Sequence, residues 1–259
     1  MRRSLARALA VCLAALLTAC GTTTTSDIAT DGPSAPSASA PSASAPTAAE
    51  APAAIRQGFQ RSLEKTVRMD VTIKAGNQTV TMRSALEPAT GGMTLDMTTP
   101  EPVSMVVTAD AVYVQQDEKD GKPWLKLDRA RLRPEGQLAQ GLDIRAQAGI
   151  LGGVVSAQSA GNGRYTGVAD PDKAVAAASS ESERATLRNA FKVLKTKAVP
   201  FTATLDDAGR LTLLTYTFDT AAGAVDNEMK MHSFGEPVTI TAPKASQTEA
   251  AAAEMYRFF

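Results

Sequence analysis

The sequence has few residues of the kinds that crosslink a fold or build a catalytic centre. Its 259 residues include two cysteines, one histidine and one tryptophan. The cysteines are Cys12 and Cys20, so no pair remains to crosslink a domain further along the chain. One histidine without cysteine partners cannot form a zinc site. We therefore expect a fold stabilised by its core alone, with no cofactor and no metal ion.

Neither basic nor acidic residues are in excess in this sequence. The chain has 27 basic and 27 acidic residues. Residues 1–19 carry three of the arginines, so their removal leaves a net charge of about −3. Domains that bind nucleic acid are typically strongly basic. The composition therefore gives no indication of a nucleic-acid partner.

No long apolar run crosses the N-terminal region. Residues 9–17 form an apolar stretch of nine residues, whereas a membrane-spanning helix needs about 20. Arginines precede this stretch, and Leu17-Thr18-Ala19-Cys20 closes it, which is typical of a secretory signal peptide. A cysteine directly after small residues resembles the bacterial lipobox, at which a diacylglycerol is attached to the thiol. We expect cleavage after residue 19 and a lipid anchor on Cys20. An ordinary signal peptide or a short transmembrane anchor is the alternative.

The remaining chain divides by composition. Residues 20–52 are almost wholly Thr, Ser, Ala and Pro after the lipidated cysteine, which predicts a disordered tether. Residues 53–245 have the apolar content of one folded domain. Residues 246–259 form a C-terminal tail whose aromatic end either covers apolar surface in a short helix or frays.

The pattern of residues 53–245 predicts an α+β domain. An amphipathic helix opens it, and the apolar period then changes from four residues to two, which is typical of antiparallel strands with one apolar face. Further strands follow two helices, the first of which starts at Asp170-Pro171. Strands are expected at 67–74, 80–86, 93–97, 103–107, 112–114, 124–127, 154–157, 164–168, 201–205, 211–219, 227–234 and 237–241, with a loose helical pattern at 135–151.

The order of these features resembles the LppX/LprG lipoproteins of actinobacteria. The resemblance covers roughly residues 53–245 and includes the closing segment 234–240, Phe-Gly-Glu-Pro-Val-Thr-Ile. It implies a curved antiparallel sheet, a half-barrel packed on helices, similar to the outer-membrane lipoprotein carrier LolA. It also implies an apolar cavity that binds acylated lipids.

Methionine is unusually frequent in the predicted strands. Seven of the nine methionines lie there. Because the side chain is unbranched and polarizable, it suits a cavity wall that adapts to different acyl chains. The alternative is that methionine fills an irregular core. The candidate cavity residues are Met69, Val71, Met82, Met93, Leu95, Met105, Val107, Leu187 and Phe191.

Motifs for catalysis are incomplete. His232 lies on the face opposite the strand methionines and is expected at the surface. Residues 62–65 have the Ser-x-x-Lys spacing without its partner motifs, and Gly161-Asn162-Gly163 leads into a strand, as a turn does. We expect no enzyme activity.

Four basic residues follow one side of the second predicted helix. They could contact anionic lipid headgroups or form a solvated face. They are Arg184, Arg188, Lys192 and Lys195.

Two functions remain open. The first is a monomeric lipoprotein on the extracytoplasmic face of the cell membrane, which binds a lipid or lipoglycan in an apolar cavity. The second is an interaction or regulatory module with a filled core. A hydrolase ranks third.

Overall fold

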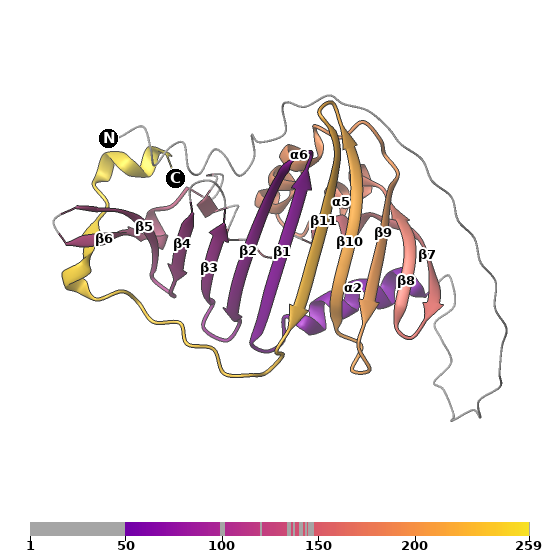
Figure 1. Cartoon of the computed structure of the whole chain (residues 1–259), viewed down its shortest axis with the longest axis horizontal. Coiled ribbons are helices and arrows are strands. Elements are labelled where there is room, and N and C mark those ends of the chain that lie inside the picture. The colour runs from indigo at the N-terminus through magenta and orange to yellow at the C-terminus, as the bar shows by residue number, and fades with distance from the viewer. Residues whose placement is uncertain are drawn as a thin grey trace.

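The computed structural model describes residues 50–98, 102–119, 121–133, 136, 138–139, 142, 144 and 148–258. The predicted signal peptide, Cys20 and most of the predicted tether lie outside these residues. The described chain forms one curved, open sheet of 12 strands in the order β12-β6-β5-β4-β3-β2-β1-β11-β10-β9-β8-β7 (Figure 1). This confirms the predicted α+β half-barrel.

Almost every neighbouring pair in this sheet is antiparallel, and only β12 runs parallel to its partner β6. The strands are β1 (Val67–Ala75), β2 (Gln78–Glu87), β3 (Gly92–Thr98), β4 (Val103–Val107), β5 (Ala111–Lys119), β6 (Lys122–Asp128), β7 (Val154–Gly161), β8 (Arg164–Ala169), β9 (Val199–Leu205), β10 (Leu211–Thr220), β11 (Gly223–His232) and β12 (Thr248–Ala250). The helices in the described residues are α2 (Ala51–Ser62), α5 (Pro171–Ala177) and α6 (Glu181–Phe191), with 3-10 turns η1 (Arg129–Arg131), η2 (Gly149–Gly153), η3 (Ala245–Gln247) and η4 (Ala253–Phe258).

The chain builds the sheet from two meanders. Strands β1 to β6 follow one another, as do β7 to β11, and the pairing of β1 with β11 joins the two sets. The alternation of apolar and polar residues gives each strand an inner face, which is buried, and an outer face. Gly76, at a φ of +56°, makes the tight turn between β1 and β2 possible.

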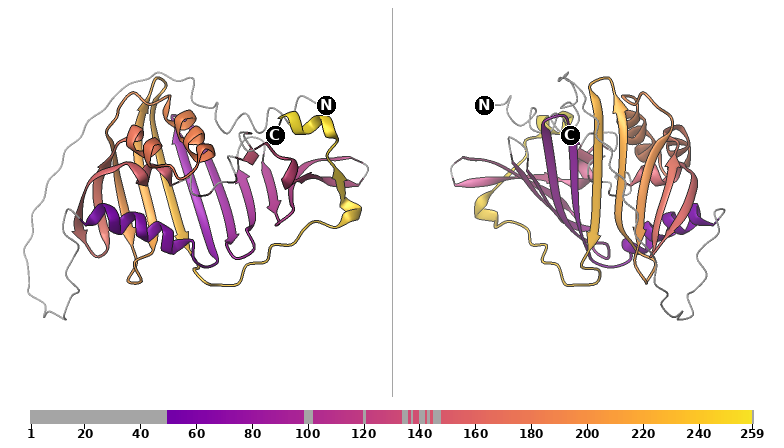
Figure 2. Two further views of the ribbon diagram at one scale, coloured as in Figure 1. Left: turned by 180° about the vertical axis from the view of Figure 1, so that it is seen from behind. Right: turned by 45° about the vertical axis from the view of Figure 1, so that its right-hand side comes forward.

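The helices lie on the inner face of the sheet. Helix α2 crosses behind β7 to β10, and α5 and α6 lie toward the other end of the strands, behind β10, β11 and β1 (Figures 1 and 2). Ile55 and Phe59 of α2 are buried in the core. Gly58 allows a close approach, because a Cβ there would lie 2.5 Å from Leu205 Cδ2.

Ser62 has a structural role at the end of α2. The residue is 1% exposed. Its hydroxyl lies 2.9 Å from the carbonyl oxygen of Gly58 and 3.0 Å from that of Leu211. The Ser-x-x-Lys spacing therefore reflects a helix end bound to β10.

Three predicted elements differ from the structure. Residues 237–241 form no strand. Val238 and Ile240 are half-buried, so apolar residues alternate with polar ones there as they do in a strand, and the Ile240 side chain lies against Gly92. Helix α6 ends at Phe191, and Leu194 instead forms a β-bridge with Thr220. In the predicted helical stretch 135–151, the residues from Gly149 onward belong to η2, and much of the rest lies outside the described residues.

The C-terminal segment covers apolar surface. Strand β12 pairs with β6, and η4 follows it. The Tyr256 ring is buried, and its hydroxyl accepts a hydrogen bond from the Asp128 N–H at 2.9 Å. The Arg131 guanidinium lies 3.9 Å from the centre of that ring. In these residues the tail therefore covers apolar surface, which is the first of its two predicted alternatives.

No helix in the described part of the chain is both long enough and apolar enough to span a membrane.

Candidate functional site

One region of the inner sheet face is less covered than the rest. Three partly exposed side chains lie in one row across the sheet: Ile73 on β1, Val80 on β2 and Tyr216 on β10. The strand pairing sets this row, because Ile73 pairs with Val80 on one side and with Asn227 on the other, and Asn227 pairs with Tyr216. Met82 and Phe218, in the neighbouring rows of this face, are also partly exposed. We call these side chains the apolar patch: Ile73, Val80, Met82, Tyr216 and Phe218.

Helix α6 brings further apolar side chains to this end of the sheet. The backbone N–H of Lys195 donates to the Asp219 carbonyl at 2.9 Å, and Leu194 forms a bridge with Thr220. Phe191 and Leu194 are partly exposed and pack against the core. The patch therefore lies beside the segment that follows α6.

Most of the predicted cavity residues lie deeper in the core. Seven of the nine, all except Met82 and Phe191, are 2–9% exposed. Six of these seven line the inner face of β1, β3 and β4: Met69, Val71, Met93, Leu95, Met105 and Val107. The seventh, Leu187, packs against Gly149, where a Cβ would lie 2.4 Å from Leu187 Cδ2. Their contact with a ligand stays a prediction.

Two polar groups lie among the apolar side chains of the patch. The Asn227 Nδ2 atom is buried and has no hydrogen-bond partner among the described residues. Tyr216 stacks on Phe218, with ring centres 6.1 Å apart, and burial raises the pKa of its hydroxyl to about 12. The environment therefore disfavours charge.

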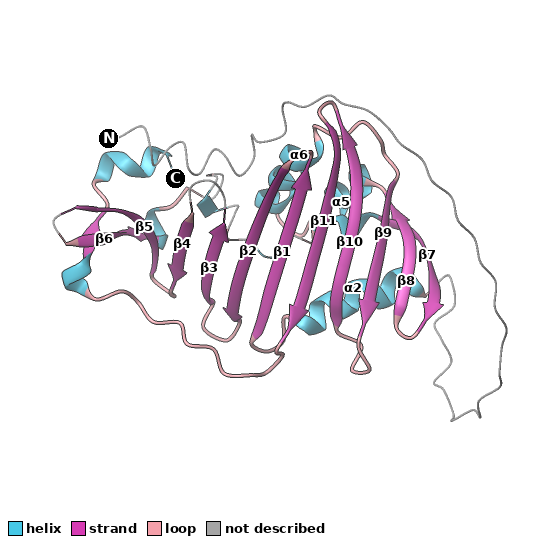
Figure 3. Cartoon of the chain, in the orientation of Figure 1, coloured by secondary structure: helices cyan, strands magenta, loops and turns pink. Residues whose placement is uncertain are grey.

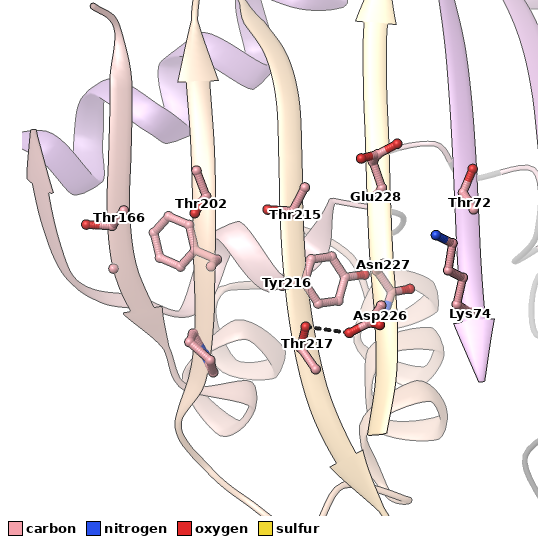
Figure 4. Close-up of a pocket in the computed structure, with 13 residues that line it drawn as sticks. Thr72, Lys74, Thr166, Thr202, Thr215, Tyr216, Thr217, Asp226, Asn227 and Glu228 are labelled. Atoms are coloured by element: carbon pink, nitrogen blue, oxygen red, sulfur yellow. Dashed lines mark hydrogen bonds between the residues drawn. The ribbon is translucent and has the colours of Figure 1, made fainter. Parts of the chain in front are cut away.

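The outer face of the sheet carries a groove of about 550 Å³, and its lining includes Tyr216 and Asn227. Helices lie behind the sheet in this view, and the groove crosses β8, β9, β10, β11 and β1 (Figure 4). It is lined by Thr72, Lys74, Thr166, Gly167, Pro200, Phe201, Thr202, Thr215, Tyr216, Thr217, Asp226, Asn227 and Glu228. The Thr217 hydroxyl donates to Asp226 Oδ1 at 2.7 Å. Hydroxyl and charged groups make this groove unsuited to an acyl chain.

Charged pairs continue along the outer face. Lys230 Nζ lies 2.8 Å from Glu228 Oε1, and this hydrogen bond raises the pKa of Lys230. His232 is exposed, with Nε2 3.4 Å from Asp70 Oδ2, which confirms its predicted surface position.

The basic residues of α6 have acidic neighbours. Arg184 and Arg188 both contact Glu181, at 2.6 and 3.1 Å, and the hydrogen bond from Arg184 is the main cause of the lowered pKa of Glu181. These three side chains form an ion-pair network on a solvated surface. This matches the alternative in which the basic residues of α6 form a solvated face.

The glycine motif between β7 and β8 is a turn, as predicted. Gly161, Asn162 and Gly163 all have positive φ values of 85°, 49° and 71°. Within the described residues, no group of three or more His, Cys, Asp or Glu side chains could hold a metal ion.

Comparison with known proteins identifies similar structures. No family model matches the chain, and no curated protein sequence matches it. The structure is similar to that of the Mycobacterium tuberculosis lipoprotein LppX, with a TM-score of 0.45 and 15% identity over 73% of this chain and 97% of LppX. It is also similar to an uncharacterized conserved protein from Thermus thermophilus, with a TM-score of 0.39 and 12% identity over 76% of this chain and 97% of that chain.

The structure therefore has the similarity to the LppX fold that the order of its sequence features led us to expect. At these scores and identities, the two matches carry no information on ligand or activity.

The sequence contains one signal for the patch that the prediction missed. Asn227 occupies an inner-face position between Val225 and Met229, where the alternation calls for an apolar residue. The positions of Ile73 and Val80 were predictable, but their partial exposure was not, because the elements that could cover them are distant in the sequence.

Proposed function

We propose that this protein is a non-catalytic cell-envelope lipoprotein that binds the acyl chain of an amphiphile on the apolar patch. In this proposal a lipid on Cys20 anchors a monomeric domain to the extracytoplasmic face of the cell membrane. The Ser/Ala/Pro-rich tether separates the domain from the bilayer. The ligand is a lipid or a lipoglycan whose acyl chain enters the half-barrel.

The observation that carries the proposal is the partial exposure of five large side chains on a sheet face whose large side chains are mostly buried. Partly exposed apolar side chains that gather on one face of a domain are a candidate ligand or partner site. Its position on the concave side favours a chain-shaped apolar ligand over a flat protein surface. Met82 lies at the edge of the patch next to the buried Val71 and Met97, so flexible side chains adjoin the site.

A second function is supported by a different observation. Seven of the nine predicted cavity residues are buried in the core. A filled core of this kind favours an interaction or regulatory module, in which the patch contacts a protein partner of the envelope.

A charge placed in the patch distinguishes the functions. A lysine at Phe218 or at Val80 would extend its amine to water while disrupting the apolar surface. We expect Phe218→Lys and Val80→Lys to weaken the binding of a pyrene-labelled fatty-acid methyl ester by at least about tenfold, measured by pyrene fluorescence, because a charge opposes apolar burial.

The matched control is Val155→Lys. Val155 is 44% exposed but lies on the edge strand β7, outside the patch. Its substitution should leave probe binding unchanged, and melting temperatures should show that all three variants fold. Equal binding by wild type and both patch variants would overturn the acyl-chain site, as would no binding by the wild type.

A further inference from the structure

The outer-face groove follows two neighbouring rows of side chains across five strands. The strand pairing sets the first row, which runs from β8 to β1 through Thr166, Thr202, Thr215, Glu228 and Thr72. The second row is offset by two residues along four of these strands and contributes Pro200, Thr217, Asp226 and Lys74. The remaining lining residues lie between the two rows. The groove therefore runs across the strands and not along them (Figure 4).

The length and access of this groove fit a chain-shaped ligand. Neighbouring strands lie about 4.8 Å apart, so the four spacings from β8 to β1 extend over about 19 Å. The first row lies low in the surface, because Thr72, Thr202 and Thr215 are half-buried. The helices α2, α5 and α6 lie on the other face of the sheet (Figures 1 and 2). A linear molecule can therefore enter the groove from solvent without a rearrangement of the sheet.

Hydroxyl groups dominate the chemistry of the groove. Five threonines line it, and each threonine hydroxyl donates one hydrogen bond and accepts two. The Thr217 hydroxyl donates to Asp226 Oδ1 at 2.7 Å. Within the described part of the chain, the hydroxyls of the other four form no hydrogen bond. A ligand with many hydroxyl groups also donates and accepts, so it complements this row.

The charged side chains in and beside the groove balance one another. Glu228 forms an ion pair with Lys230 at 2.8 Å, and Asp226 lies opposite Lys74 in the strand pairing. A carboxylate is a strong acceptor for hydroxyl donors, but it repels an anionic ligand. An uncharged ligand therefore fits the groove better than a phosphorylated or carboxylated one.

The groove lacks the side chains that usually anchor a protein partner. The binding energy of protein interfaces is concentrated in Trp, Tyr and Arg, whereas Thr is under-represented among the residues that carry it. The two aromatic residues of the lining, Phe201 and Tyr216, pair with one another at inner-face positions. The outer-face side chains therefore favour a sugar chain over a protein.

We propose that this groove binds a neutral, extended glycan chain through its row of threonines and Asp226. Successive strands present their hydroxyls about 4.8 Å apart, which is close to the length of one sugar unit. The site lies on the opposite face of the sheet from the apolar patch. The glycan site therefore does not depend on the proposed acyl-chain site.

Amide chemical shifts of the isotope-labelled full chain test the site. The probes are cellohexaose, a straight neutral hexasaccharide, and hexagalacturonate, which has as many sugar units and a carboxylate on each. We expect cellohexaose to shift the amide signals of β8 to β11 and β1 around the groove. Hexagalacturonate should bind at least about tenfold more weakly, because its carboxylates meet Asp226 and Glu228.

Threonine-to-valine variants remove hydroxyls while keeping the shape of the side chain. Thr202→Val combined with Thr215→Val should weaken cellohexaose binding by about tenfold, since each lost hydrogen bond is worth a few-fold in affinity. The matched control is Thr94→Val, a half-buried outer-face position on β3 outside the groove, which should bind as the wild type does. Melting temperatures should show that all the variants fold.

Four results would overturn the glycan site. They are no binding of cellohexaose by the wild type, shifts confined to residues outside the groove, tighter binding of hexagalacturonate than of cellohexaose, and unchanged affinity in the folded double variant. The pyrene-labelled ester reports on the inner face in the same samples, and the double variant should bind it as the wild type does. The failure of one site is therefore distinguishable from the failure of the other.

Discussion

A single carboxylate closes the turn between β9 and β10. Asp206 Oδ1 accepts hydrogen bonds from the backbone N–H groups of Ala208 at 3.0 Å and Arg210 at 2.9 Å, and Oδ2 accepts from Arg210 Nε at 2.8 Å. Partial burial raises the pKa of Asp206, but the hydrogen bonds from Arg210 and Ala208 outweigh it, so the pKa lies below its usual value. The Arg210 guanidinium also lies 4.3 Å from the centre of the Phe234 ring. The charged form of Asp206 therefore stabilises the folded state.

The stability that Asp206 contributes depends on pH in one direction. The folded pKa is below the unfolded value of about 3.9, so the contribution is complete above about pH 4 and is lost as the pH falls through the folded pKa. We expect Asp206→Asn to lower the free energy of unfolding at pH 7 by about 1–2 kcal/mol. Urea unfolding of both proteins between pH 7 and pH 2 measures this difference. A difference that stays constant over this range would contradict the role of the charge.

The roles of residues that depend on short local sequence patterns could be predicted from the sequence. The turn around Asp206 and the surface position of His232 both depend on local alternation and turn residues. The lack of a partner for Asn227 was not accessible, because it depends on what Ile73 and Tyr216 present from neighbouring strands.

Turn η2 and helix α5 pack through adjacent glycines. Asp170 caps α5, with its Oδ1 accepting from the backbone N–H of Asp172 at 2.8 Å, and Pro171 occupies the first turn, as the sequence predicts. A Cβ on Gly153 would lie 2.1 Å from the Asp170 carbonyl oxygen and 2.9 Å from the Ala174 nitrogen. A Cβ on Gly152 would come no closer than 3.3 Å, to the Ala177 Cβ.

These glycines form a matched pair for mutation. Gly153→Ala would force a methyl group into the backbone of α5, so we expect it to destabilise the protein by about 1–3 kcal/mol or more. Gly152→Ala should cost clearly less, because its shortest contact, 3.3 Å to the Ala177 Cβ, needs only a small adjustment of α5. Thermal unfolding of the two variants gives the comparison. Equal melting temperatures would show that α5 moves away from η2 without cost.

The accuracy of the predicted elements depends on the range of the interactions that form them. Strands β1 to β6 were predicted from local alternation. Strand β12 was missed, because three residues, Thr248–Ala250, have no pattern of their own and pair in parallel with the distant β6. Residues 237–241 were wrongly predicted as a strand, because half-burial of alternate side chains occurs there without a neighbouring strand to pair with.

The described residues form a half-barrel on which the helices cover one part of the inner face. The helices lie behind β7 to β11 and the end of β1, while the chain after β11 runs past the ends of the strands from β1 toward β6 and reaches β12 (Figure 3). The order of elements predicted an α+β domain, and the curvature was expected from the resemblance to the LppX/LprG lipoproteins. The apolar patch was not, since its exposure depends on how α6 sits against strands far away in the sequence.

The anchor is tested at the N-terminus. Only a thiol at position 20 can receive a lipid in the predicted lipobox, so Cys20→Ser should release the protein from the membrane in soluble form or leave it unprocessed. Membrane fractionation and the intact mass of the protein report both results. Equal membrane retention with the same processed mass would contradict the lipid anchor.

Native mass spectrometry of the protein extracted from the membranes of its own host tests the acyl-chain site most directly. We expect the wild-type protein to carry a second, non-covalent mass that matches an acylated lipid or lipoglycan. Met82→Trp should lose that mass at a nearly unchanged melting temperature, because the indole would occupy part of the patch. A wild-type protein that carries no such mass, together with a Met82→Trp variant destabilised by the overpacking cost of about 1–3 kcal/mol, would contradict the account and favour an interaction module with a filled core.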